Sequence, residues 1–142
     1  MANYKQFENG IFIGPQPTKQ DLVEAKQQGV HTVIDMRMLS ETTSPNAELV
    51  KNSGLNYVNI PVDKAALSVQ QIDEFDAAMK QDNGPVLLHC ATGARAAMLL
   101  ALSRSRQNGW TAERTFQEAN AMGYDLQSSP DFATFVRQTT EK

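Results

Sequence analysis

Short apolar runs alternate along the chain with longer segments in which apolar residues recur every three or four positions. The short runs are typical of buried strands, and the longer segments are typical of amphipathic helices. The predicted strands are 11–13, 30–36, 55–60 and 85–89, and the predicted helices are 18–28, 45–53, 68–81, 94–106, 111–122 and 129–138. This order predicts a three-layer α/β fold, in which a mostly parallel sheet of about four strands carries helices on both faces.

Two predicted helices carry strong start signals. Thr18 with Asp21, and Ser68 with Gln71, have the spacing of capping boxes, in which each partner binds a backbone N–H of the other. Gly109 follows the helix 94–106 closely and is expected to end it, because glycine readily adopts the left-handed conformation that closes many helices. These signals mark where the helices begin and end, and therefore which residues form the loops between them.

Length and charge limit the function classes. The 142 residues are expected to form a single domain, 1–142, which can bury a core without disulfides or structural metal. A net charge of −3 argues against non-specific binding of nucleic acid or of an anionic membrane surface. The chain has neither a long apolar run nor a secretory signal pattern, so we expect a cytoplasmic location.

The cysteine and histidine content limits the chemistry further. Cys90 is the single cysteine, and the chain has two histidines. Cys90 therefore cannot form an internal disulfide, and these residues cannot complete a usual tetrahedral zinc site. We expect neither a metal nor a cofactor.

The segment with the clearest chemical signal lies between the predicted strand 85–89 and the helix 94–106. It reads His89-Cys90-Ala91-Thr92-Gly93-Ala94-Arg95. Ligands of parallel α/β sheets bind beyond the carboxyl ends of the strands. A tight loop at this place directs backbone N–H groups into one concavity, which the N–H groups of the first helical turn also face. The sequence therefore predicts an anion-binding loop.

Cys90 and Arg95 lie at the two ends of this loop. The positive field there favours the thiolate of Cys90, which could act as a nucleophile. The planar guanidinium of Arg95 can bind two oxygens of an oxyanion, and its charge would oppose the helix dipole unless an anion lies nearby. The residues between them, expected to contact the bound anion, are Ala91, Thr92, Gly93 and Ala94.

Four other side chains are candidates for the surroundings of this loop. His89 could contact the substrate, although a buried histidine that orients the loop is the preferred interpretation over a general base. Arg37 could assist an anionic substrate or form a salt bridge with a neighbouring carboxylate. Trp110 and Tyr124 could border the pocket or serve in packing.

The loop resembles the active loop of the cysteine-based protein tyrosine and dual-specificity phosphatases, which begins His-Cys and ends in Arg. Those enzymes have five residues between Cys and Arg, whereas Cys90 and Arg95 are separated by four, as in rhodanese-type sulfurtransferases. Most of the chain resembles bacterial phosphatase-like proteins related to the N-terminal part of beta-lactamase hydrolase-like proteins. This resemblance rests on Ile13-Gly14-Pro15-Gln16-Pro17-Thr18, on Thr32-Val33-Ile34-Asp35-Met36-Arg37 and on the four-residue spacing.

The resemblance implies a phosphatase that acts on a phosphate monoester, carried by a phosphorylated small molecule or a phosphoprotein. Cys90 would attack phosphorus, and water would hydrolyse the cysteinyl-phosphate. Arg95 and the loop amides would stabilise the charge on the phosphoryl oxygens. Asp63 is similar in position to the acid of dual-specificity phosphatases and would protonate the leaving oxygen, with Asp35 and Asp125 as weaker candidates.

Two alternatives stay open. The shorter loop would also suit a persulfide on Cys90, as in a sulfurtransferase, and Ala96 stands where phosphatases usually carry Ser or Thr. A non-catalytic module that binds a phosphorylated partner is the second alternative. The oligomeric state is not predicted.

Overall fold

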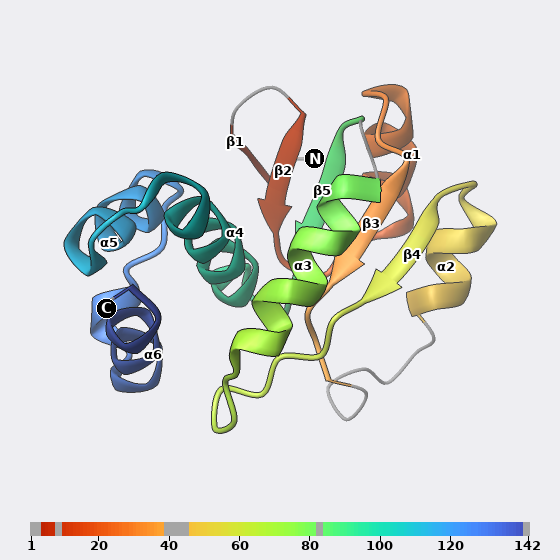
Figure 1. The fold of residues 1–142 in the computed structure, drawn as a ribbon. Coiled ribbons are helices and arrows are strands. Elements are labelled where there is room, and N and C mark those ends of the chain that lie inside the picture. Colours follow the sequence, from red (N-terminus) through yellow and green to blue (C-terminus); the bar gives the residue numbers. More distant parts are fainter. Residues whose placement is uncertain (1–3, 8–9, 39–45, 82–83, 141–142) are drawn as a thin grey trace.

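Five strands form one sheet in the computed structural model, which describes residues 4–7, 10–38, 46–81 and 84–140 (Figure 1). The strands are β1 (Lys5–Phe7), β2 (Ile11–Gly14), β3 (Thr32–Asp35), β4 (Asn56–Asn59) and β5 (Val86–His89). The helices are α1 (Lys19–Gln27), α2 (Asn46–Asn52), α3 (Val69–Gln81), α4 (Ala94–Asn108), α5 (Ala112–Ala121), the 3₁₀ helix η2 (Leu126–Ser128) and α6 (Pro130–Thr140).

The strand order across the sheet is β1-β2-β5-β3-β4. The last four of these strands are parallel, and β1 pairs antiparallel with β2. In the centre, Leu88 of β5 lies opposite Ile13 on one side and Ile34 on the other. The predicted mostly parallel α/β sheet is confirmed, and β1 is an addition that the sequence pattern did not predict.

Helices cover both faces of the sheet (Figure 1). Leu87 of β5 packs in the core cluster that includes Leu22 and Ala25 of α1, whereas Leu88 packs in the cluster that includes residues of α3 to α6. Successive side chains of a strand point to opposite faces, so a strand buried on both faces is apolar throughout. This burial makes β5 a rigid base for the loop that follows it.

The predicted capping box at Thr18 is confirmed, whereas the one at Ser68 is confirmed in part, because the Gln71 N–H donates to the Ser68 carbonyl oxygen at 3.2 Å. Thr18 Oγ1 accepts a hydrogen bond from the Asp21 N–H at 3.1 Å, and Asp21 Oδ2 accepts one from the Thr18 N–H at 2.9 Å. The Ser68 N–H donates to Gln71 Oε1 at 3.1 Å. Gly109 follows α4 with a φ of 67°, the left-handed conformation expected of a helix end.

The other predicted elements are confirmed with shifts of at most two residues at their ends, while Pro45, the predicted start of α2, lies outside the described residues. Within the described ranges, no helix has the length and apolar character needed to cross a membrane. In the same ranges, no three His, Cys, Asp or Glu side chains are grouped so that they could hold a metal ion.

Candidate active site

The loop from Cys90 to Gly93 lies where three parallel strands end. It directly follows β5, whose last residue, His89, is flanked by Gly14 of β2 and Asp35 of β3. α4 begins at Ala94, immediately after the loop. The predicted placement of the loop at the carboxyl edge of the sheet is therefore observed.

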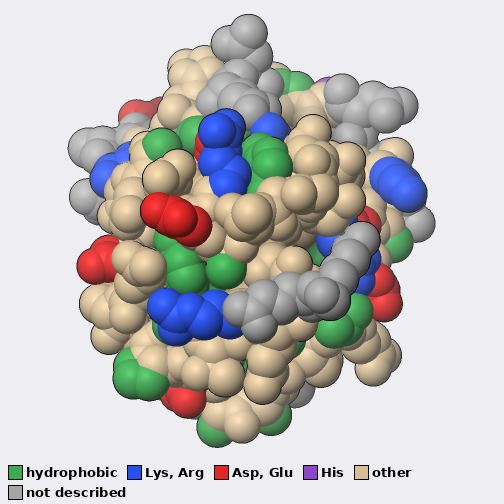
Figure 2. Space-filling view, turned by 60° about the vertical axis from the view of Figure 1, so that its left-hand side comes forward, with side chains coloured by type: hydrophobic (Ala, Val, Ile, Leu, Met, Phe, Trp, Pro, Cys, Tyr) green, Lys and Arg blue, Asp and Glu red, His purple; other side chains and the backbone are tan. Residues whose placement is uncertain are grey.

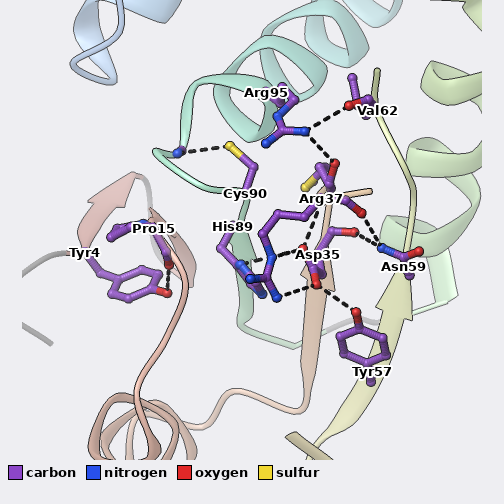
Figure 3. Close-up of polar contacts among 12 residues, drawn as sticks. Tyr4, Pro15, Asp35, Arg37, Tyr57, Asn59, Val62, His89, Cys90 and Arg95 are labelled. Carbon is purple, nitrogen blue, oxygen red and sulfur yellow. Dashed lines mark hydrogen bonds and ion pairs between the residues drawn. The ribbon is translucent and has the colours of Figure 1, made fainter. Parts of the chain in front are cut away.

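Gly93 gives the loop its curvature. Its φ of 102° lies in the left-handed region, which glycine adopts with little strain. A Cβ at this position would lie 2.1 Å from the hydroxyl oxygen of Tyr124, so a larger residue would have to displace Tyr124. The curl directs the Gly93 N–H to the Cys90 Sγ, with a nitrogen-to-sulfur distance of 3.0 Å (Figure 3). Cys90 itself is buried, with 1% of its surface exposed.

A cavity of about 420 Å³ opens beside this loop. Its walls come from the loop and the start of α4, from the segment after β4, and from α6. The lining residues are Met38, Val62, Asp63, Lys64, Ala91, Thr92, Ala94, Arg95 and Phe132. The structure thus brings Asp63 and Arg95, which are 32 positions apart in the sequence, to one cavity next to the loop that holds Cys90.

Arg95 is half-buried in the cavity wall. Its Nη1 donates a hydrogen bond to the Val62 carbonyl at 2.9 Å and a longer one to the Met36 carbonyl at 3.5 Å (Figure 3). These bonds link the first turn of α4 to the segments that follow β3 and β4. Because Val62 directly precedes Asp63, Arg95 also fixes the backbone that carries the candidate acid.

Asp63 lies in a tight turn at the cavity wall. Its Oδ1 accepts a hydrogen bond from the Ala65 N–H at 2.9 Å, and its carbonyl accepts one from the Ala66 N–H at 2.9 Å. The side chain remains partly exposed. Asp63 therefore shapes the turn and at the same time lines the cavity.

Arg37 lies in a buried network rather than at the cavity. Its Nε and Nη2 donate to the two carboxylate oxygens of Asp35 at 3.0 and 3.1 Å, and Tyr57 donates to Asp35 Oδ2 at 2.7 Å (Figure 3). Only 3% of Arg37 is exposed. The sequence left open whether Arg37 contacts the substrate or forms a salt bridge. The structure shows the salt bridge, with Asp35 as the partner.

Burial and hydrogen bonding set the protonation states in this network. Burial acts to raise the pKa of Asp35, but hydrogen bonds from Arg37 and Tyr57 help to hold it below its usual value. Burial lowers the pKa of His89 to about 4, so His89 is neutral at neutral pH. His89 Nδ1 lies 3.8 Å from Asp35 Oδ1, and the ring is fully buried beneath the loop. This placement matches a histidine that orients the loop.

Comparison with known proteins identifies the family. Residues 3–107 match the family described as "Beta-lactamase hydrolase-like protein, phosphatase-like domain". The chain belongs to this family. A beta-lactamase hydrolase-like protein of Xylella fastidiosa (strain Temecula1) is 29% identical over 121 residues, which cover 82% of this chain and 28% of that protein. The chain therefore spans about a quarter of the length of the curated relatives that it matches.

Solved structures agree with this assignment to the phosphatase-like family. A candidate phosphatase from Shewanella putrefaciens CN-32 has a TM-score of 0.80 and 26% identity, covering 97% of this chain and 88% of that one. Tk-PTP in its active form has a TM-score of 0.82 and covers 99% and 97% of the two chains. At 16% identity, the likeness to Tk-PTP shows a shared protein tyrosine phosphatase-like fold.

Two residues at the site of this phosphatase-like domain lie after residue 107, beyond the matched region. Tyr124 donates a hydrogen bond to the Thr92 carbonyl at 3.2 Å, and Phe132 of α6 lines the cavity with the Nζ of Lys64 5.2 Å from its ring centroid. Phe132 lies in the helix predicted over 129–138. Lys64 and Phe132 were missed as site residues because no local signal links their distant segments.

The remaining candidates lie away from the cavity of the phosphatase-like domain. Asp125 caps η2, where its Oδ1 accepts from the Gln127 N–H at 3.1 Å. Trp110 lines a separate cavity of about 310 Å³ at the carboxyl end of α4.

On the face drawn in Figure 2, Lys and Arg side chains are interspersed with acidic and hydrophobic ones.

Proposed function

We propose that this phosphatase-like domain is a cysteine-dependent phosphatase that hydrolyses a phosphate monoester through a cysteinyl-phosphate intermediate. One observation carries the proposal: the Cys90 Sγ accepts a hydrogen bond from the loop at the amino end of α4, beside a cavity lined by both Arg95 and Asp63. A nucleophile, an anion-binding cation and a proton donor are the three groups that this reaction requires.

In the first step, the thiolate of Cys90 attacks phosphorus. The sulfur–phosphorus bond forms as the phosphorus–oxygen bond to the leaving group breaks, and Asp63 donates its proton to the leaving oxygen. In the second step, water attacks phosphorus and gives a proton to the Asp63 carboxylate. The sulfur–phosphorus bond then breaks, which restores the thiolate and releases inorganic phosphate.

Arg95 and the backbone amides of the loop would stabilise the phosphoryl oxygens during both steps. Charge on these oxygens is favoured by N–H donors at a helix amino end and by the fixed positive charge of a guanidinium. Ala96, which is fully buried in α4, has no hydroxyl group to assist the breakdown of the intermediate. We therefore expect the second step to be slow.

The substrates that we propose are phosphorylated small molecules or phosphoproteins. A cysteine-to-serine variant of P. aeruginosa TpbA, whose fold matches this chain with a TM-score of 0.71, has been solved in complex with phosphotyrosine. At 16% identity the likeness concerns the fold, so it supports a phosphate ester as ligand rather than a particular substrate.

Hydrolysis of an aryl phosphate by the purified chain tests the proposal. We expect Cys90→Ser to lower kcat/KM by at least about 1000-fold and Asp63→Asn to lower it by about 100-fold. A general acid must be protonated, so activity should fall where the carboxyl group ionises, and this fall should be absent in Asp63→Asn. Asp125→Asn, at the cap of η2, is the matched control and should retain activity. Full activity in Cys90→Ser would overturn the proposal.

The four-residue spacing between Cys90 and Arg95 favours a second candidate, sulfur transfer. The Cys90 thiolate would attack the outer sulfur of thiosulfate, release sulfite and form a persulfide, which a second thiol or cyanide would then accept. Treatment with thiosulfate should then add about 32 mass units to the Cys90 peptide, the mass of one sulfur atom. This adduct, found in a protein that hydrolyses no phosphate ester, would favour the sulfurtransferase over the phosphatase.

A further inference from the structure

Tyr124 touches the loop from outside the cavity. It follows α5 and is half-buried against the loop, where its hydroxyl group donates to the Thr92 carbonyl at 3.2 Å. A Cβ built on Gly93 would lie 2.1 Å from the oxygen of the same hydroxyl group, so Tyr124 fills the space beside Gly93. Tyr124 is not among the residues that line the cavity, so it contacts the loop without forming part of the cavity wall.

The bond from Tyr124 acts on the peptide group that also faces the sulfur. The Thr92 carbonyl and the Gly93 N–H belong to one peptide group, and the described chain has no cis peptide bond. In a trans peptide the C=O and N–H point in opposite directions. With the carbonyl held by Tyr124, the N–H points to the Cys90 Sγ, which it reaches at 3.0 Å.

The orientation of this peptide group depends on the bond from Tyr124, because the backbone of Gly93 does little to prevent rotation. Glycine adopts positive and negative φ values with similar ease, so a rotation of the Thr92–Gly93 peptide meets little steric resistance. A rotated peptide would turn the carbonyl oxygen towards the sulfur and remove the N–H donor. Both changes would disfavour the thiolate, because a charged acceptor gains most from a hydrogen bond.

We infer that Tyr124 is a positioning residue, which holds the Thr92–Gly93 peptide so that its N–H stabilises the Cys90 thiolate. The inference rests on the proposed function, in which this thiolate is the nucleophile. Tyr124 acts through the loop and does not touch the reacting atoms. The segment after the matched family region thereby contributes directly to the reactivity of the site.

The surroundings of Tyr124 keep its hydroxyl group protonated, so that it can donate a hydrogen bond. Burial raises its pKa, and the charge of Cys90 raises it further, so the hydroxyl group stays protonated at neutral pH. Lys5 of the edge strand β1 lies with its Nζ 5.9 Å from the centroid of the Tyr124 ring. Arg95, Asp63 and Lys64 line the cavity beside the loop, and His89, Asp35 and Arg37 form the buried network next to it. Tyr4 interacts electrostatically with Tyr124 and with this network. Removal of the Tyr124 hydroxyl leaves all of them in place.

The fraction of Cys90 present as thiolate tests the inference in Tyr124→Phe, which removes one oxygen atom and keeps the ring. Cys90 is the single cysteine, so its ionisation can be read from the ultraviolet absorbance of the thiolate after subtraction of the Cys90→Ser spectrum. At the pH where half of the wild-type sulfur is ionised, we expect roughly 10–30% in Tyr124→Phe, since one lost hydrogen bond shifts such an equilibrium about two- to tenfold. Thermal unfolding checks that the variant is folded.

Tyr4→Phe is the matched control, because the Tyr4 hydroxyl group also donates to a backbone carbonyl, but to that of Pro15 and not to a carbonyl of the loop. We expect it to leave the thiolate fraction unchanged. An unchanged fraction in Tyr124→Phe, or an equal loss in Tyr4→Phe, would overturn the inference. The thiolate absorbance can be measured without any turnover. A wild-type protein that hydrolyses no phosphate ester would therefore refute the proposed function, while the role of Tyr124 would still be decided by these spectra.

Discussion

Two arginines follow neighbouring strands of the sheet and have different surroundings. Arg37, after β3, is 3% exposed and binds both carboxylate oxygens of Asp35. Arg95, after β5, is half-buried, donates to the Val62 carbonyl and lines the cavity beside Cys90. The sequence predicted both as possible anion-binding residues.

The difference shows what separates a structural cation from a functional one. A guanidinium held in two bonds to a buried carboxylate has its charge compensated within the core, and its loss leaves the carboxylate unpaired. A guanidinium in a cavity wall can bind an anion that enters. We therefore expect changes at Arg37 to affect mainly the stability of the fold and changes at Arg95 to affect mainly catalysis.

The largest effect is expected from Arg37→Met. This change leaves Asp35 buried without its ion-pair partner, which typically costs about 3–5 kcal/mol in the free energy of unfolding. Urea unfolding followed by circular dichroism measures this loss, and kcat/KM of the folded fraction should change much less than in Arg95 variants.

Arg106→Met is the control for this prediction. Arg106 also pairs with carboxylates, Asp73 and Asp76, but its own side chain is 36% exposed and theirs are 61% and 19% exposed. An ion pair at the surface contributes at most about 1 kcal/mol. Equal losses of stability in the two variants would contradict the distinction between the buried and exposed pairs.

The pH dependence of stability tests the same buried region with the next largest effect. The pKa of His89 is about 4 in the folded protein, below its usual 6.5, so the unfolded chain binds more protons between these values. Stability should therefore fall as the pH is lowered from 6.5, by about 2 kcal/mol at pH 4.5. His89→Gln should lose most of this slope in thermal unfolding, whereas His31→Gln, at an exposed position, should keep it. If His89→Gln kept the wild-type dependence of stability on pH, the assignment of this dependence to His89 would be refuted.

Arg95→Lys should change the free energy of unfolding least of the three, and its effect should be on catalysis instead. Lysine keeps the charge and loses the planar pair of donors that fits a phosphoryl group. We expect kcat/KM for an aryl phosphate to fall about 100-fold, or about 2.7 kcal/mol, with the unfolding midpoint nearly unchanged. A variant with wild-type turnover and lowered stability would make Arg95 a structural residue like Arg37.

Much of the fold follows from local sequence signals. Residues 11–13 and 85–89 are apolar runs between turn signals, and Thr18 with Asp21 marks a helix start that the structure reproduces. β1 has no such signal, because its three residues include one apolar side chain, Phe7, and its pairing with β2 is a contact between separate segments.

The site follows from the sequence only in part. The loop from Cys90 to Arg95 is continuous in the sequence, so its composition predicts its shape. The approach of Tyr124 to Thr92, which are 32 positions apart in the sequence, depends on how α5 and η2 pack. For Arg37, the choice between substrate and salt bridge depends on which carboxylate the fold buries beside it, and the sequence alone left both open.

The most direct test of the central claim is mass spectrometry of the protein quenched with denaturant during hydrolysis of an aryl phosphate. Because the chain has one cysteine, a phosphoryl group on sulfur can be assigned without ambiguity. Our account predicts an adduct of about 80 mass units on the Cys90 peptide, as expected for covalent catalysis by a cysteine nucleophile. Continued hydrolysis in Cys90→Ser, with no such adduct in the wild-type protein, would contradict it.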